Sequence, residues 1–412
     1  MKTKTKTTGI ILILLAAGLY STKAYSQTAY IPNYGDNAVY VINVSTNSVI
    51  DTIPVGNAPI GVSVSPDGSS VYIANNGDTT VSVINTATNK VTARITVGRN
   101  PWGIAVSPNG MNVYVANDSS KSVSVINTAT KLVTATIPVG NIPIGLAIVP
   151  DGSKVYVLND SDNTVSVINT ITNLVTATIP VGHGPFGVFA SFDGTKVYVA
   201  NQFSNSVSVI NTTTNLVMAT IPVGAGPYGL ATTPDGSKLY VTNNGDNADS
   251  VSVINTATNT VFATVIVGPN PYNANVTPDG SKVYVTNEFG RSVSVISTAT
   301  NIVLNTITVG NNPSALGNFF SSSVTGIASQ SIETENISIF PNPFTSQTTI
   351  AFSQEQKNST ISITDVLGKE IRKQTFSGRE FIIEKGEMSS GIYFVRIVDE
   401  NKNAMTRKIV VQ

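Results

Sequence analysis

A four-residue phrase, Tyr-Val/Ile-x-Asn, recurs along the chain at an almost constant spacing. Successive copies lie 42 residues apart, with one final step of 44. The copies begin at Tyr30, Tyr72, Tyr114, Tyr156, Tyr198, Tyr240 and Tyr284. A period of about 40 to 50 residues made of short β segments and glycine-rich turns is typical of a β-propeller, whose blades are stable only as a closed ring. The sequence therefore predicts an all-β fold with seven blades.

Each repeat contains four strand-like segments. In one repeat they are residues 101–110, 112–117, 122–127 and 132–140. Each segment is a short run of β-branched residues bounded by turn residues, and it alternates as a half-buried strand does. Pro-Asp-Gly or a near variant joins the first two segments, and its glycine supplies the positive φ that a tight hairpin needs.

The seventh blade is divided between the two ends of the repeat region. Complete repeats start at Pro59, Pro101, Pro143, Pro185, Pro227 and Pro271, which makes six. Residues 29–55 supply the last three strands of a seventh, and residues 313–320 supply a first strand. We therefore expect a three-plus-one blade that joins the two ends and removes the open edges of a linear array.

The composition excludes some classes of partner and chemistry. Charged residues make up 12% of the chain, about half the usual share of roughly 25%. The formal net charge is zero, and lysines occur singly, so a nucleic-acid partner is not expected. Cysteine is absent, which leaves neither disulfides nor thiolate ligands for a metal.

Residues 1–26 have the pattern of an export signal. Three lysines precede an apolar run from Ile10 to Leu19, and residues 24–26 form a small-x-small cleavage site. The alternative is a membrane anchor. An anchor needs about 20 apolar residues, and this run offers about ten.

The repeat does not return after residue 320. Residues 321–336 are small and polar and are expected to be a linker. Residues 337–412 are expected to form a small β-sandwich. Its strand-like segments are residues 337–340, 348–352, 359–365, 370–375, 381–383, 391–398 and 408–411.

Ligand-reading residues are expected where the repeats differ on one rim of the ring. The crossover between blades leads into the innermost strand, at the mouth of the central channel. The residue after the crossover proline is Ile60, Trp102, Ile144, Phe186, Tyr228, Tyr272 or Ser314. The four aromatic residues predict either a binding surface for sugars, apolar molecules or peptides, or a plug that closes the mouth.

Other rim residues are weaker candidates. Arg99 and His183 occupy the variable crossover position, and His183 is the only histidine of the chain. The loops between the second and third strands carry further charged residues: Asp36, Asp78, Asp118, Asp160, Asp162, Asp246, Asp249, Glu288 and Arg291. His183 and Glu288 are the weak catalytic candidates. The stretch Asp160–Asn163 lacks the glycine and the bidentate glutamate of a calcium loop, so neither a metal nor a cofactor is expected.

The repeated phrases Tyr-Val-Ala-Asn, Val-Ser-Val-Ile-Asn-Thr-Ala-Thr and Ala-Thr-Ile-Pro-Val-Gly resemble the YVTN family of β-propeller repeats over residues 29–320. Members of that family include surface-layer proteins, binding proteins and some enzymes, so the resemblance implies a fold rather than an activity.

The C-terminal segment resembles the type A sorting domain of the type IX secretion system. The residues that carry this resemblance are Pro341, Asn342, Pro343, Asp365, Gly368, Gly391, Tyr393 and Lys408. The resemblance implies transport across the outer membrane by the type IX machinery. It also implies removal of the sorting domain and attachment of the cargo to surface lipopolysaccharide. An accessory β-sandwich that binds carbohydrate or spaces the propeller is the alternative.

Three functional hypotheses follow. The first is a secreted or cell-surface binding scaffold that holds a glycan, peptide or protein through Arg99, Trp102, His183, Phe186, Tyr228 and Tyr272. The second is a propeller enzyme of lactonase or lyase type that uses His183, Glu288 or rim aspartates. The third is a passive surface-layer component, for which near-identical blades of low charge suffice.

Overall fold

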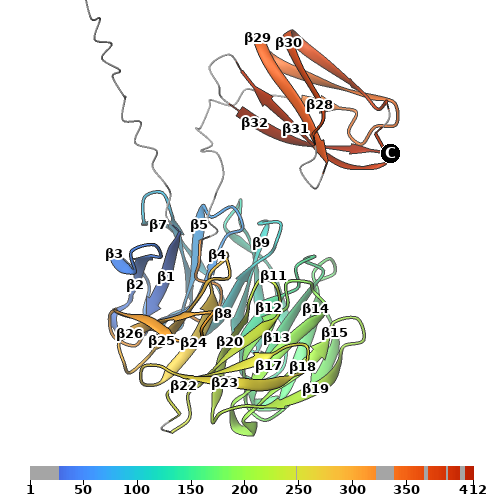
Figure 1. The fold of residues 1–412 in the computed structure, drawn as a ribbon. Helices are drawn as coiled ribbons and strands as arrows, with labels where there is room; N and C mark the ends of the chain where they lie inside the picture. The colour runs from blue at the N-terminus through green and yellow to red at the C-terminus, as the bar shows by residue number, and fades with distance from the viewer. Residues whose placement is uncertain (1–26, 247, 322–337, 366–369, 387, 400–403) are drawn as a thin grey trace, which may run out of the picture. The chain divides into compact units, whose positions relative to one another are not determined.

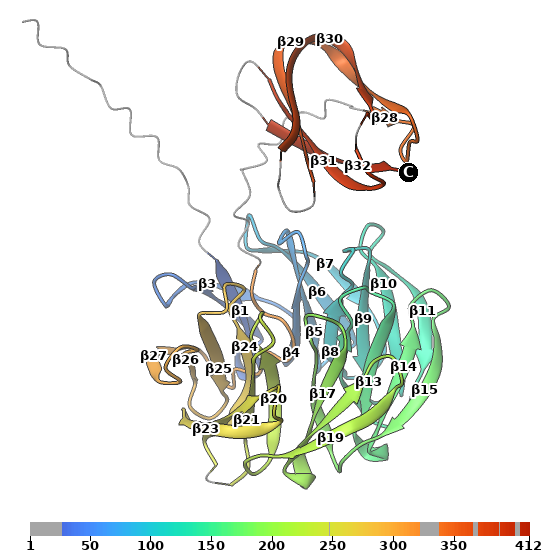
Figure 2. The same ribbon diagram turned by 45° about the vertical axis from the view of Figure 1, so that its right-hand side comes forward.

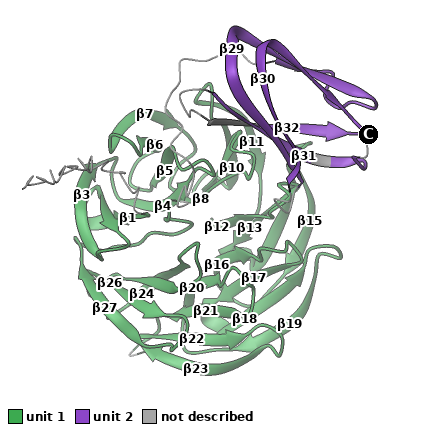
Figure 3. Ribbon diagram, turned by 45° about the horizontal axis from the view of Figure 1, so that its top comes forward, with its two compact units in different colours: residues 1–323 green, residues 324–412 purple. Residues whose placement is uncertain are grey.

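Each complete repeat forms a four-stranded antiparallel sheet in the computed structural model, which describes residues 27–246, 248–321, 338–365, 370–386, 388–399 and 404–412. The sheets surround one central axis (Figure 3). The first three are β4 (Pro59–Val64), β5 (Ser70–Asn75), β6 (Thr80–Asn85), β7 (Lys90–Thr96); β8 (Pro101–Val106), β9 (Asn112–Asn117), β10 (Ser122–Asn127), β11 (Leu132–Pro138); and β12 (Pro143–Ile148), β13 (Lys154–Asn159), β14 (Thr164–Asn169), β15 (Leu174–Pro180).

The next three sheets repeat this plan. They are β16 (Pro185–Ala190), β17 (Lys196–Asn201), β18 (Ser206–Asn211), β19 (Leu216–Pro222); β20 (Pro227–Thr232), β21 (Lys238–Asn243), β22 (Ser250–Asn255), β23 (Thr260–Ile266); and β24 (Pro271–Val276), β25 (Lys282–Asn287), β26 (Ser292–Ser297), β27 (Val303–Thr308). The second strand of each sheet is buried on both faces, because the neighbouring sheets cover it. The fourth strand alternates, with its polar residues in solvent.

Hydrogen bonds within the Pro-Asp-Gly turns explain why this sequence recurs. In the variant Phe192-Asp193-Gly194 the Ser191 hydroxyl and the Thr195 backbone N–H both donate to Asp193, at 2.6 and 3.0 Å. The Ser191 bond is the main reason that the pKa of Asp193 lies below its ordinary value. Gly194 follows with φ of +70°, in the left-handed region that glycine adopts freely. The turn is therefore scaffold in each blade that carries it.

The three-plus-one closure is confirmed. β1 (Thr28–Asn33), the single turn η1 (Tyr34–Asp36), β2 (Ala38–Asn43) and β3 (Ser48–Pro54) give a three-stranded sheet. Residues 313–320 complete it, through isolated bridges between Ala29 and Phe320 and between Asn33 and Pro313. This segment is not the regular strand that the repeat pattern predicts. The first and last sheets lie side by side (Figures 1 and 2).

Two asparagines support the irregular closing segment. Asn273 stands where five of the other inner strands have glycine, and its Nδ2 donates to the carbonyl oxygen of Ala315 at 2.7 Å. Asn275 donates to the carbonyl oxygen of Gly317 at 3.0 Å. These side-chain bonds add to the few backbone bonds of the segment, such as the one from Tyr30 N–H to the Phe319 carbonyl oxygen at 2.9 Å, and the carbonyl groups of Ala315 and Gly317 are paired.

In four blades the repeated tyrosine donates a hydrogen bond to an asparagine of the next blade, from Tyr30, Tyr156, Tyr240 and Tyr284. The Tyr156 hydroxyl donates to Asn215 Oδ1 of the following blade at 2.9 Å, and Tyr240 does the same with Asn301. Tyr284 joins the last complete blade to the first one, through Asn47 Oδ1 at 2.6 Å. Burial raises the pKa of Tyr156 and of Tyr240 to about 12. The hydroxyl groups of Tyr156 and Tyr240 therefore stay protonated at physiological pH and can donate these hydrogen bonds.

The second compact unit of the chain, residues 324–412, contains its own core. Its described strands are β28 (Ser338–Phe340), β29 (Gln347–Asp365), β30 (Glu370–Glu384), β31 (Gly391–Val398) and β32 (Ala404–Val411). Five strands replace the predicted seven, because β29 and β30 each run through two predicted segments. β29 pairs with β28 at its start and with β31 at its end, so its two halves enclose one core (Figure 1).

The residues of the sorting motif organise this unit. Val410 of the last strand donates its N–H to Asn342 Oδ1 at 2.8 Å, between the two cis-prolines Pro341 and Pro343. The Tyr393 hydroxyl donates to the carbonyl oxygen of Ser389 at 3.0 Å.

The remaining motif residues fall at ends and pairs of strands. Asp365 pairs with Tyr393 across β29 and β31, Gly391 begins β31, and Lys408 lies in β32. Gly368 lies outside the described residues, as do the predicted signal (1–26) and most of the linker (322–336). Within the described chain, no helix has the length and apolar character to cross a bilayer.

Tyr284→Phe should lower the free energy of unfolding of the propeller by about 1 kcal/mol, because it removes the bond to Asn47 across the closure. Trp102 is the only tryptophan and lies in the propeller, so its fluorescence during urea unfolding reports on the ring alone. The control is Tyr114→Phe. Asn173 is the asparagine of the next blade that corresponds to Asn47, and its Oδ1 accepts no hydrogen bond. The Tyr114 change should therefore lower the free energy of unfolding clearly less. Equal losses in the two variants would refute the closing role of Tyr284.

Candidate functional site

The second residue of each inner strand points into the central channel. These residues pack against one another in a channel cluster of Ile60, Trp102, Ile144, Phe186, Tyr228, Tyr272 and Leu316. The rings of Phe186 and Tyr228 are stacked, with their centroids 3.9 Å apart. Tyr272 meets Phe186 edge-on at 5.7 Å, and Trp102 does so at 5.8 Å. The four aromatic residues that the repeat pattern singled out are therefore in one place.

The aromatic cluster closes the channel and also leaves a surface. Phe186 and Tyr272 are each only 6% exposed, whereas Trp102 and Tyr228 are half-buried. The packing is tight because glycine follows the cluster residue: a Cβ at Gly187 would lie 1.9 Å from the carbonyl oxygen of Tyr228. Phe186 and Tyr272 thus serve as a plug, whereas Trp102 and Tyr228 keep part of their surface accessible to solvent.

Ser314 is not a member of the cluster, contrary to the repeat alignment. It is buried and its hydroxyl donates to the carbonyl oxygen of Pro59 at 3.1 Å. Leu316 takes its place in the channel because residues 313–320 are irregular, which shifts the register by two residues.

A second ring surrounds the aromatic cluster, and the sequence did not single it out as a set. Its members directly follow the repeated asparagine of each blade. We call them the mouth ring: Tyr34, Asn76, Asp118, Asp160, Gln202, Asn244 and Glu288. The backbone N–H of each one donates to the carbonyl oxygen of the crossover residue that has a left-handed conformation, at 2.8–3.0 Å. The scaffold therefore fixes seven backbone positions at the mouth and leaves their side chains free to vary.

The neutral amides of the mouth ring are bonded to the scaffold. Asn244 Nδ2 donates to Asn270 Oδ1 at 2.7 Å and to the carbonyl oxygen of Pro271 at 3.2 Å. Gln202 Nε2 donates to the Tyr228 hydroxyl at 3.4 Å. The amide groups of Asn244 and Gln202 are therefore engaged in hydrogen bonds within the propeller.

The three acidic members are poorly compensated. The Asp118 carboxylate accepts the indole N–H of Trp102, and Glu288 accepts Asn312 Nδ2 at 3.5 Å. Among the described residues, no side-chain hydrogen bond reaches the Asp160 carboxylate and no ion pair involves any of the three. Burial raises the pKa of all three carboxyl groups, and the charge of Asp118 adds to the shift at Asp160. The mouth therefore carries uncompensated negative charge.

Three other rim aspartates have structural roles. Asp36, Asp78 and Asp162 each accept the backbone N–H of a crossover residue, at 2.7–3.1 Å. Ser120 and Ser204 do the same for the crossover residues Arg99 and His183, both at 2.8 Å. These side chains satisfy backbone groups and are not available for chemistry.

One pair of substitutions confirms this capping role. Pro269 occupies the crossover position in one blade and has no N–H to be capped. The residue at the capping position of that blade is Gly290, which has no side-chain acceptor. In this blade the donor and its cap are therefore absent together.

Arg99 and His183 stay at the periphery. Both side chains are exposed, and the hydrogen bonds that the structure gives these residues involve their backbone atoms. His183 and Glu288 do not hydrogen-bond each other, so no acid–base pair is formed. Among the described residues, no group of three or more His, Asp or Glu side chains is arranged to hold a metal ion.

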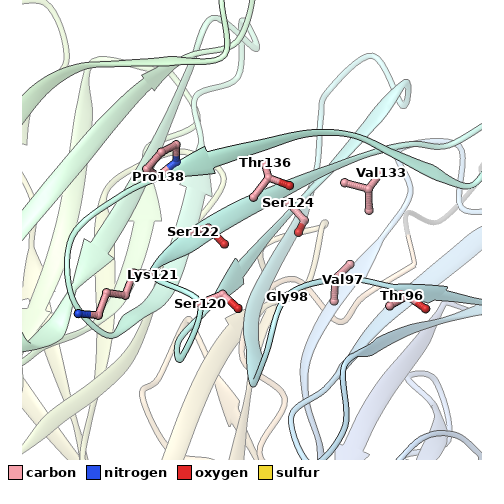
Figure 4. Close-up of a pocket in the computed structure, with 10 residues that line it drawn as sticks. All are labelled: Thr96, Val97, Gly98, Ser120, Lys121, Ser122, Ser124, Val133, Thr136 and Pro138. Carbon is pink, nitrogen blue, oxygen red and sulfur yellow. The ribbon is translucent and has the colours of Figure 1, made fainter.

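Two surface grooves lie away from the mouth, between blades on the outer wall. One has a volume of about 490 Å³ and the other of about 530 Å³. The first is lined by the end of β7, by the loop before β10 and by β10 and β11 (Figure 4). The second is its equivalent two blades further on. The capping residues Ser120 and Ser204 line the two grooves, at positions where three other blades have the larger aspartate.

Family comparisons agree with both units. Residues 58–151 and 141–247 match the YNCE-like beta-propeller family, and residues 338–412 match the secretion system C-terminal sorting domain. The chain thus carries a region that matches YNCE-like β-propellers and a C-terminal type IX sorting domain. The sorting domain implies interaction with the type IX machinery and secretion to the cell surface or the extracellular space.

The solved structures show the same fold. Hydrazine synthase of Kuenenia stuttgartiensis is 24% identical, with a TM-score of 0.62 over 66% of this chain and 92% of that chain. A protein of unknown function from Desulfotomaculum acetoxidans is 16% identical, with a TM-score of 0.63 over 71% and 98%. A candidate 6-phosphogluconolactonase from Bacteroides uniformis is 18% identical, with a TM-score of 0.61 over 71% and 99%. At these identities only the fold is shared.

A curated relative matches a short part of the chain. The endo-acting ulvan lyase of Formosa agariphila is 33% identical over 78 residues, which is 19% of this chain. The match spans 15% of that enzyme's length.

The propeller should become more stable at neutral pH when a mouth carboxylate is made neutral. Folding raises the pKa of the Glu288 carboxyl group. Such a group contributes to stability below its unfolded pKa of about 4. This contribution is lost as the pH rises through the folded pKa. Glu288→Gln or Asp160→Asn should therefore add about 0.5 kcal/mol at pH 7, a value already reduced for solvent screening. The gain should vanish below about pH 4.

Urea unfolding followed by Trp102 fluorescence at both pH values measures this gain. The control is Asp193→Asn in a turn on the opposite rim, where hydrogen bonding lowers the pKa of the carboxyl group. That change should destabilise the propeller at pH 7. Loss of stability in the Glu288 and Asp160 variants would mean that these carboxylates serve the fold.

Proposed function

We propose that the secreted propeller is a binding module, and that its ligand carries a positively charged group to the mouth ring. The observation that carries this proposal is the set of three half-buried carboxylates, Asp118, Asp160 and Glu288, that have no cation partner. Buried charge without a partner lowers stability, and such an arrangement is usual at binding and catalytic sites.

The exposed aromatic surface favours the same ligand. Trp102 and Tyr228 remain half-buried beside the carboxylates. An ammonium or guanidinium group is attracted both to a carboxylate and to the face of an indole or phenol ring. A lysine or arginine side chain of a peptide or protein combines this charge with an apolar stem that can pack on the aromatic plug.

The location on the cell surface belongs to the same proposal. The sorting domain is the part that the type IX machinery reads, and its removal would leave residues 27–320 as the mature cargo. Attachment of that cargo to surface lipopolysaccharide would display the mouth ring to extracellular partners. The similarity to type A sorting domains supports this order of events.

Titration of the mature chain with a fluorescent hexalysine peptide tests the ligand class. We expect saturable binding that weakens as salt is added, because exposed charges are screened. The triple variant Asp118→Asn/Asp160→Asn/Glu288→Gln should bind at least about tenfold more weakly, which is a loss of about 1.4 kcal/mol. Asp51→Asn on the outer strand β3 changes the net charge without touching the mouth and should bind as the unmodified chain does.

Two outcomes would contradict the proposal. Equal binding by the triple variant would place the peptide elsewhere on the molecule. Binding of neutral oligosaccharides, with no binding of hexalysine, would make the mouth a glycan site.

A further inference from the structure

The outermost strand of every blade has one free edge. β3, β7, β11, β15, β19, β23 and β27 each lie at the end of a sheet and pair on one side only among the described residues. A free edge presents unpaired N–H and C=O groups that can template another strand. Proteins protect such edges with charged residues, with proline or with a covering segment.

Two neighbouring blades carry this protection. β7 has Lys90 and Arg94, and β3 has Asp51, all three on the outer strand. In a third blade the ammonium group of Lys238 lies 5.8 Å from the centre of the Phe262 ring on β23, which places a charge beside that edge.

Three consecutive blades lack such charges, and their outer strands carry proline only as the last residue. β11 and β15 have the same sequence, Leu-Val-Thr-Ala-Thr-Ile-Pro, and β19 differs from it only by Met218. Each strand begins with a leucine that is about two-thirds exposed: Leu132 at 64%, Leu174 at 63% and Leu216 at 65%. The outer strands of these blades also contact one another. We call this surface the leucine edge.

We propose that the leucine edge pairs with the leucine edge of a second copy of this chain. Identical strands are complementary in an antiparallel pair, and a two-fold pair of this kind closes on itself. When two copies of β11 are centred on Ala135, Thr134 lies opposite Thr136, and no charge faces a like charge. Threonine pairs of this kind are favourable across antiparallel strands.

The surroundings of the edge favour a second copy over a charged partner. The strands offer neither cations nor anions, so a basic or acidic protein gains nothing specific there. The chain has no net charge, so two copies repel each other little at long range. Val133, Thr136 and Pro138 of β11 line the groove of Figure 4, and a paired copy would cover that groove as well.

The sequence itself provides the variant that tests this pairing. Lys90 and Arg94 of β7 occupy the positions of Leu132 and Thr136 in β11, so the charge pattern of one blade can be copied to the others. The edge-charged variant carries Leu132→Lys, Thr136→Arg, Leu174→Lys, Thr178→Arg, Leu216→Lys and Thr220→Arg. All six positions are exposed, so the ring should fold, and Trp102 fluorescence and thermal unfolding check that it does.

Sedimentation velocity of the mature chain, over micromolar to millimolar concentrations, measures the association. We expect the unmodified chain to form dimers, and the edge-charged variant to associate at least about tenfold more weakly. A neutral variant, Leu132→Thr/Leu174→Thr/Leu216→Thr, copies Thr260 of β23 and should also weaken association. An unmodified chain that remains monomeric, or a folded edge-charged variant that still associates, would overturn the proposal. Weakening by charge alone, with the neutral variant unaffected, would assign the effect to repulsion and also overturn it.

Discussion

The hydrogen bond from a tyrosine in one blade to an asparagine in the next blade holds four pairs of neighbouring blades together, among them the pair that closes the ring. The accepting residue must satisfy two conditions at once. It adopts a left-handed backbone conformation in the turn between the third and fourth strands, with φ of 52° at Asn47 and 55° at Asn215, and it offers a side-chain oxygen to the tyrosine. Asparagine is the residue that meets both conditions at little cost. A repeat of 42 residues is thus maintained by contacts between blades as well as within them.

Closure of the ring also decides which residues can differ between blades. The six complete blades close with regular strands, but the seventh closes with residues 313–320, which are irregular. Asn273 and Asn275 depart from the repeat because they must reach these carbonyl groups. Pro269 and Gly290 depart together because one removes the donor that the other would have capped. Such departures look like functional signals in the sequence, and the structure assigns them to the scaffold.

The sequence predicted the ring, the split blade and the sorting motif, because each depends on a pattern that repeats or that lies close together in the chain. It did not predict that Trp102 and Tyr228 stay only half-buried while Phe186 and Tyr272 are buried. This difference depends on how closely neighbouring inner strands approach each other. A Cβ at Gly187 would prevent that close approach. It also merged Asp78, Asp118 and Asp162 into one group of rim acids. The backbone groups that Asp78 and Asp162 cap lie 21 residues away in the chain. The capping role that distinguishes these two aspartates from Asp118 is therefore visible only in the folded ring.

The distinction between scaffold and site therefore rests on what each side chain satisfies. Asp162 caps a backbone N–H, and its hydrogen bonds from Asn141 lower the pKa of its carboxyl group. Asp160, two residues away, has a backbone held by the same scaffold, yet burial raises its pKa and no cation compensates it. Folding gains from the first carboxylate and loses from the second. An acidic residue that weakens the fold, held in a fixed position beside the half-buried rings of Trp102 and Tyr228, supports the proposal that a ligand brings the missing charge.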